Sequence, residues 1–138
     1  MKTALLTAAA FLAFTPAAFA EMVNYKADLK ASSEVPANDS KGTGALTATY
    51  DTASKKLTYS VTYKDLTGPA TAAHFHGPAA AGVNAGVAVP VIEMVPSPLK
   101  GEATLTDEQA KQLSDGQMYF NIHTAANKGG EIRGQVTK

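Results

Sequence analysis

The sequence contains no cysteine and no tryptophan, and only three histidines. The absence of cysteine excludes disulfides, thiolate zinc sites, iron–sulfur clusters and a cysteine nucleophile. Any metal ion must therefore be held by nitrogen and oxygen ligands. Stability must come from the core, because no covalent cross-link is available.

Beyond the first residues, the chain also lacks a run of about 20 apolar residues, the length needed to span a bilayer as a helix. Residues 1–2 supply a short positive start, residues 3–14 are apolar, and residues 18–20 form a small-x-small pattern. These features are typical of a secretory signal peptide, and we expect residues 1–20 to be removed after Ala20. The mature chain, residues 21–138, is then expected to be soluble and periplasmic or secreted, with no membrane span.

Neither charge sign is in excess. Removing 20 of the 138 residues leaves 118, with 11 basic and 12 acidic side chains. This balance argues against nucleic-acid binding and against a polybasic membrane anchor, since both need a concentrated positive surface. A chain of this length suits one domain with one core.

Short segments in which apolar and polar residues alternate with a period of two follow one another along the mature chain, as β-strands do. The expected strands are residues 23–29, 46–50, 57–63, 70–76, 87–94, 100–105, 118–123 and 131–136, the last two forming a hairpin. Turn signals recur about every ten residues, the spacing of a β-sandwich or barrel. One segment differs, because Thr106 and Gln109 form a capping box that predicts a short helix ending at Asp115 and Gly116.

The histidines lie in two of the predicted strands. A period of two places His74 and His76 on the face opposite Phe75, and His123 on the face opposite Phe120 and Ile122. If the aromatic and aliphatic side chains fill the core, the imidazoles cannot be core residues. Three imidazoles on neighbouring strands would form a nitrogen platform with an open position, suited to copper or zinc.

A structural role is the competing interpretation. In that case His74 and His123 are partly buried polar residues, hydrogen-bonded to the backbone or to Glu131. Arg133 is the only arginine in the sequence. This indicates a position that needs a planar guanidinium group, able to form two hydrogen bonds to one carboxylate, and the expected partner is Glu34 or Glu131. A structural ion pair between the first loop and the last hairpin is the favoured interpretation of Arg133, and anion binding is the alternative.

Several segments together resemble one known family, the CHRD domain, named after chordin. They are SEVP at residues 33–36, GTG at 42–44, AAHFHGP at 72–78, YFNIHT at 119–124 and GEIRGQV at 130–136. Ala37 and Lys128 depart from the pattern at positions where proline is common, and neither is a histidine. The resemblance implies an exported protein with an immunoglobulin-like β fold, distantly similar to copper-zinc superoxide dismutases, and it implies no settled activity.

We therefore expect an all-β, immunoglobulin-like or superoxide-dismutase-like sandwich with one short helix. The first function hypothesis is a divalent-metal site, copper or zinc, formed by His74, His76 and His123, and binding is expected rather than catalysis. The alternative is a non-catalytic interaction module for an extracellular or envelope protein. A superoxide-dismutase-like metalloenzyme is a third hypothesis, disfavoured because a dinuclear copper-zinc site would need more than the three histidines present.

Overall fold

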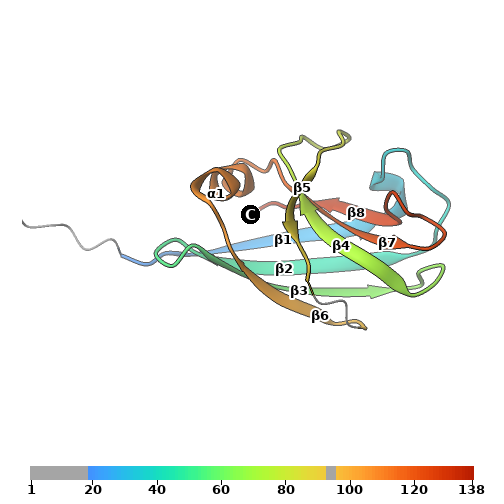
Figure 1. The fold of residues 1–138 in the computed structure, drawn as a ribbon, viewed down its shortest axis with the longest axis horizontal. Coiled ribbons are helices and arrows are strands. Elements are labelled where there is room, and N and C mark those ends of the chain that lie inside the picture. The colour runs from blue at the N-terminus through green and yellow to red at the C-terminus, as the bar shows by residue number, and fades with distance from the viewer. Residues whose placement is uncertain (1–18, 93–95) are drawn as a thin grey trace, which may run out of the picture.

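The structure, a computed structural model, describes residues 19–92 and 96–138 (Figure 1). Its strands are β1 (Met22–Lys30), β2 (Thr43–Asp51), β3 (Lys56–Lys64), β4 (Ala70–His76), β5 (Val87–Pro90), β6 (Leu99–Thr104), β7 (Tyr119–Thr124) and β8 (Ile132–Gln135). A 3-10 turn, η1 (Ala31–Ser33), follows β1, and one α-helix, α1 (Asp107–Ser114), precedes β7. The prediction of an all-β fold with one short helix is confirmed. The predicted signal peptide lies almost entirely outside the described residues.

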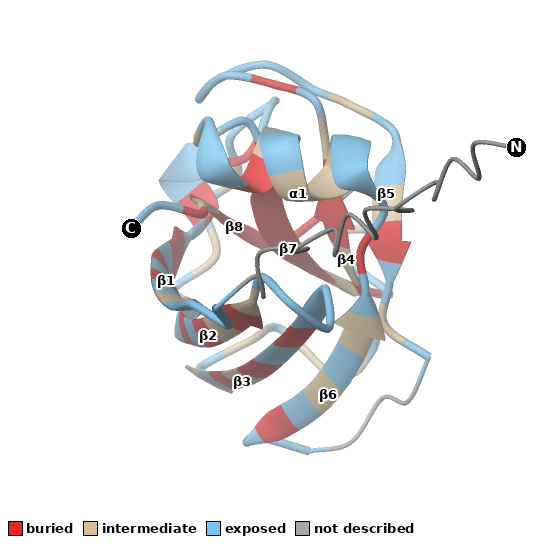
Figure 2. Ribbon diagram, turned by 90° about the vertical axis from the view of Figure 1, so that its left-hand side faces the viewer, coloured by how far each residue is buried: buried red, intermediate tan, exposed pale blue. Residues whose placement is uncertain are grey.

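The strands form one antiparallel sheet in the order β5-β4-β7-β8-β1-β2-β3-β6. The sheet folds over on itself, so that β5, β4, β7 and β8 face β1, β2, β3 and β6 across the core (Figure 2). The two halves meet where β1 and β8 run together, through the Lys30–Arg133 pair and a bridge between Lys26 and Thr137. The result is a nearly closed sandwich, as the turn spacing predicts.

Alternating burial along the strands builds the core. In β3 the side chains of Leu57, Tyr59 and Val61 point inward, and the residues between them are more exposed. Across the sandwich, the ring of Tyr59 packs edge-on against Phe75 of β4, with centroids 5.1 Å apart. The prediction that Phe75, Phe120 and Ile122 fill the core is confirmed, since each is fully buried.

The helix begins at the predicted capping box. The hydroxyl of Thr106 accepts from the backbone N–H of Gln109, and the Gln109 side chain accepts from the Thr106 N–H. Leu113 packs the helix into the core at one end of the sandwich.

One strand differs from its expected length. The fifth strand was predicted over residues 87–94, whereas β5 ends at Pro90, and residues 93–95 lie outside the described residues. Proline has no N–H to donate to a ladder, so it suits the end of an edge strand. In the described part of the chain, no helix is long and apolar enough to cross a membrane.

Candidate metal centre

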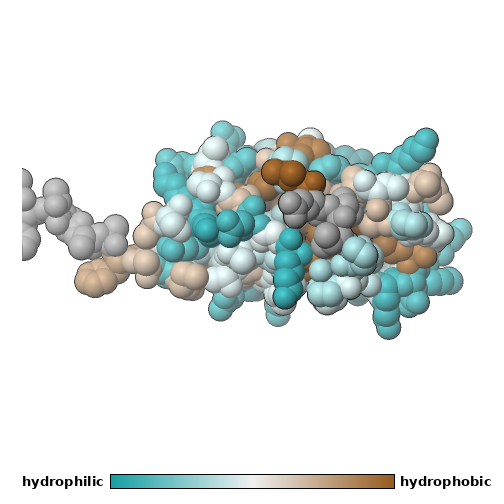
Figure 3. Space-filling view, turned by 60° about the horizontal axis from the view of Figure 1, so that its bottom comes forward, coloured by the Kyte–Doolittle hydropathy of each residue, from teal (hydrophilic) through white to brown (hydrophobic). Residues whose placement is uncertain are grey.

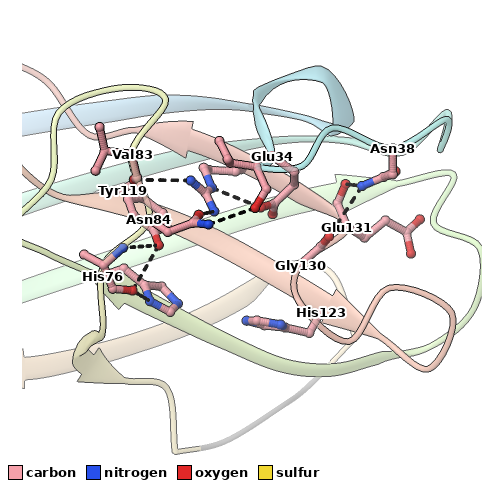
Figure 4. A network of polar contacts seen from close by, with 12 residues as sticks. Glu34, Asn38, His76, Val83, Asn84, Tyr119, His123, Gly130 and Glu131 are labelled. Atoms are coloured by element: carbon pink, nitrogen blue, oxygen red, sulfur yellow. Dashed lines mark hydrogen bonds and ion pairs between the residues drawn. The ribbon is translucent and has the colours of Figure 1, made fainter.

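The three histidines predicted as ligands meet on the outer face of β4 and β7. These strands are neighbours, with His74 opposite Asn121 and His123 opposite Ala72. One ring nitrogen from each of His74, His76 and His123 can be chosen so that all lie within 4.8 Å of one another. Figure 4 shows the rings of His76 and His123 directed toward each other. The strand register thus brings together the side chains that the period-two pattern placed on one face.

The spacing of these nitrogens is close to what a metal ion requires. His74 Nδ1 lies 3.1 Å from His123 Nε2, and the ring centroids of His74 and His76 are 5.4 Å apart. Two nitrogens bound to the same zinc ion at about 2.0–2.1 Å can be no more than about 4.2 Å apart. Small rotations of the rings would therefore bring all three imidazoles to bonding distance.

Backbone carbonyls fix the orientation of two of the rings. His76 Nδ1 lies 2.9 Å from the carbonyl oxygen of Ala85, and His123 Nδ1 lies 2.8 Å from that of Lys128. A carbonyl only accepts hydrogen bonds, so each Nδ1 carries the proton and each Nε2 keeps its lone pair. Metal-binding histidines are held in the same way, through the ring nitrogen that does not face the ion.

The pKa values of His74 and His76 are lowered, which favours the neutral form. Burial lowers the pKa of His74, and the neighbouring His123 and His76 lower it further. Burial also lowers the pKa of His76, although the Ala85 carbonyl and Asn121 oppose this shift. Imidazoles must be neutral to bind a metal, so both pKa shifts favour the protonation state that binding requires.

The site is partly open to solvent. His76 is only 8% exposed, and its Nε2 is buried without a hydrogen-bond partner. His74 and His123 are half-buried. An ion at this point would thus be reachable from solvent past these two rings.

A buried ion pair supports the site from one side. Arg133 Nε donates to Glu34 Oε2 at 3.0 Å, and a second guanidinium nitrogen donates to Asn84 Oδ1 at 2.6 Å (Figure 4). The guanidinium also lies over the ring of Tyr119, 4.0 Å from its centroid, and the His76 ring stacks on Tyr119 at 4.8 Å. Since β4 and β8 flank β7, Tyr119 connects the ion pair to the histidine site.

This arrangement decides between the two interpretations of Arg133. Its partner is Glu34, one of the two predicted, and the pair joins the loop after β1 to the last hairpin. Arg133 is 4% exposed and directs its donors to protein acceptors, which supports a structural role rather than anion binding.

Glu131, the other predicted partner, belongs to a separate network. Its buried carboxylate accepts from Ser40 Oγ at 2.6 Å, from Thr67 Oγ1 at 2.7 Å and from the hydroxyl of Thr124. Burial alone raises its pKa, but the hydrogen bonds from Ser40, Thr124 and Thr67 lower it to about 2. The backbone N–H of Thr67 and the Asn127 amide also donate to it, so the donors described for Glu131 are hydroxyl, backbone and amide groups rather than a histidine.

Sequence reasoning missed the residues that support the histidines. The carbonyls of Ala85 and Lys128 are backbone groups, and no side-chain pattern indicates them. Tyr119 was grouped with a strand but given no role. The period of two also puts Asn121 on the same strand face as His123, which is the signal that could have singled it out.

Comparison with known proteins is consistent with the sequence pattern. The CHRD domain family model matches residues 25–136, which include every strand from β2 to β8 and most of β1. No curated protein and no solved structure matches the chain. The resemblance carried by the histidine and hairpin motifs is thereby confirmed, and the chain belongs to the CHRD domain family.

Proposed function

We propose that this CHRD domain is an exported protein that binds one divalent transition-metal ion, copper or zinc, through His74, His76 and His123. The observation that carries the proposal is the convergence of three ring nitrogens within 4.8 Å on the outer face of the sheet. Export rests on the leader-like residues 1–20, and the metal site rests on the geometry.

Copper and zinc are favoured by the donor type. Imidazole nitrogen suits both ions, whereas calcium and magnesium prefer oxygen ligands. Binding requires one proton to move. His74 Nδ1 faces the Nε2 lone pair of His123 and donates to it, so the His74 proton must shift to Nε2 before Nδ1 can bind the ion.

A second function is favoured by a different observation. Val35, Val83 and Val87 are 38%, 52% and 53% exposed, and they lie on the loop after η1 and on the segment from the end of β4 into β5. Asn84 joins these segments by donating to the carbonyl of Val35 at 2.9 Å. Exposed valines beside the site would suit a protein partner, with the histidines then only structural. The face in Figure 3 is largely hydrophilic or neutral, with hydrophobic residues near its upper centre and toward its right-hand side.

Calorimetric titration separates these functions. Untagged protein is titrated with Zn²⁺ and with Cu²⁺, and so are the variants His74→Ala, His76→Ala and His123→Ala. One ion per chain is expected for the wild type, with a sharp loss of affinity in each variant. Asp51→Ala serves as the control, because Asp51 ends β2 and its carboxylate accepts from the backbone N–H groups of Ala53 and Ser54 in the turn to β3, not from a histidine.

Wild-type protein that binds neither ion more tightly than the triple histidine variant would contradict the metal proposal. The interaction module would then remain as the function that the exposed valines support.

A further inference from the structure

Asn121 is a buried amide at the centre of the outer face. It is 1% exposed, lies directly across from His74 and comes two residues before His123 on the same strand face. On its other side β8 places Arg133 opposite it. Asn121 therefore stands between the histidine site and the Glu34–Arg133 ion pair.

The surroundings of Asn121 fix which end of its amide faces the ion pair. Glu34 Oε1 and Asn121 Nδ2 both lie close to the Cα atom of Gly130, which has no side chain. A Cβ atom at this position would be 2.3 Å from Glu34 Oε1 and 2.7 Å from Asn121 Nδ2, so the two atoms are near each other. Glu34 Oε1 is a buried acceptor without a hydrogen-bond partner, and Asn121 Nδ2 is a donor beside it. The amide nitrogen thus faces the carboxylate, and the amide oxygen faces away from it, toward the histidines.

At the opposite end of the amide, two acceptors meet without a donor. Asn121 Oδ1 and His76 Nε2 are both buried and both lack a hydrogen-bond partner. Asn121 lies within hydrogen-bonding reach of His76. The proton of His76 is on Nδ1, held by the Ala85 carbonyl, so Nε2 presents a lone pair to the Asn121 oxygen.

Turning the amide or moving the His76 proton would replace this conflict with another. Reversing the amide would bring its oxygen against the Glu34 carboxylate, and moving the His76 proton to Nε2 would set Nδ1 against the Ala85 carbonyl. Buried acceptors without a donor are costly, and a cation between them satisfies both.

We infer that the carboxamide oxygen of Asn121 is a fourth protein ligand of the ion held by His74, His76 and His123, which makes the site a three-nitrogen, one-oxygen site for a divalent ion. This inference rests on the proposed metal-binding function. Glu34, oriented by Arg133, is then a positioning residue, because its carboxylate lies beside the amide nitrogen and favours the orientation in which the amide oxygen points toward the ion. An oxygen ligand is hard, so the site favours Zn²⁺ or Cu²⁺ over Cu⁺.

The test compares two amide-to-leucine variants. Asn121→Leu removes the oxygen while keeping a side chain of similar shape. Gln135→Leu is the matched control, since Gln135 is a partly buried amide on the same face that donates to the carbonyls of Ala79 and Gly116. Zn²⁺ affinity is expected to fall by about 10–100-fold in Asn121→Leu, the range typical for loss of a supporting group at a metal site. Gln135→Leu is expected to match the wild type.

A second measurement does not depend on how well the variant folds. A crystal structure of the wild type with Zn²⁺ should place Asn121 Oδ1 about 2.0–2.2 Å from the ion. A third measurement compares the visible absorption of Co²⁺-substituted wild type and Asn121→Leu, which should differ because it reports coordination number and ligand type.

The outcomes separate this inference from the proposed function. If the wild type binds no ion, the metal-binding function itself is wrong. If it binds one ion through the histidines while a water molecule takes the place of the Asn121 oxygen, and Asn121→Leu binds Zn²⁺ as tightly as the wild type, the function stands and the fourth-ligand inference is overturned.

Discussion

The buried carboxylate of Glu131 should make the stability of the domain depend on pH in a predictable way. Its pKa in the folded protein is about 2, against an ordinary value of 4.5. At about 1.4 kcal/mol per pKa unit, this difference amounts to roughly 3 kcal/mol of free energy of unfolding. Because the folded-state pKa is the lower one, the stabilisation is present above pH 4.5 and is lost as the pH falls toward 2.

Glu131→Gln removes the charge and keeps the shape. At pH 7 the variant should be less stable than the wild type by about 3 kcal/mol, since the hydroxyls of Ser40, Thr67 and Thr124 lose an ionised acceptor. The difference should shrink toward zero as the pH falls to 2 and below, because wild-type Glu131, with a pKa of about 2, becomes protonated there. Urea unfolding followed by circular dichroism at several pH values measures both quantities.

Other groups titrate in the same window, but they cancel in the comparison. Burial raises the pKa of Glu34, which acts in the opposite direction and gains stability as the pH falls. Wild type and Glu131→Gln share this contribution. Glu102→Gln is the control, since Glu102 is exposed and pairs with Lys56 at the surface, where an ion pair is worth about 0–1 kcal/mol. A Glu131→Gln difference that stays constant from pH 7 to pH 2 would refute the reasoning.

The remaining predictions concern the core, the site and the leader. Phe120→Ala should lower the free energy of unfolding by about 3–5 kcal/mol, and His123→Ala by much less in metal-free protein; urea melts in the reverse order would mean that the faces of β7 are wrongly assigned. Metal affinity should fall at acidic pH, below the ordinary histidine pKa of about 6.5, because protons then compete for the imidazoles and burial lowers the pKa of His74 and His76; calorimetry at pH 7.5, 5.5 and about 4.5 tests this, and equal affinities at all three would speak against histidine ligands. Intact mass of the exported protein should correspond to cleavage after Ala20, and a mature N-terminus beyond Val23 would remove part of β1 from the fold.

The sequence alone predicted the strand positions and the shared face of the histidines, because both follow from a period of two. His74, His76 and His123 could be grouped by this rule without any knowledge of strand order. The rule also placed Phe75 and Phe120 in the core. These are local properties of a strand, and they need no tertiary information.

Other features depend on contacts that no periodicity records. The choice of Glu34 over Glu131 as the partner of Arg133 depends on how the loop after β1 folds over β8. The carbonyls that orient His76 and His123 come from the loops at Ala85 and Lys128, whose paths are set by tertiary packing. The end of β5 at Pro90 depends on the loss of a ladder donor at a sheet edge.

Native mass spectrometry tests the central claim most directly. Untagged wild-type protein is incubated with one equivalent of Zn²⁺, and its mass is compared with that of the variant in which His74, His76 and His123 are all replaced by alanine. Retention of one ion per chain by the wild type, and of none by the triple variant, is the result expected from the convergence of the three rings. Equal retention by both proteins, or none by either, would contradict a three-histidine metal site.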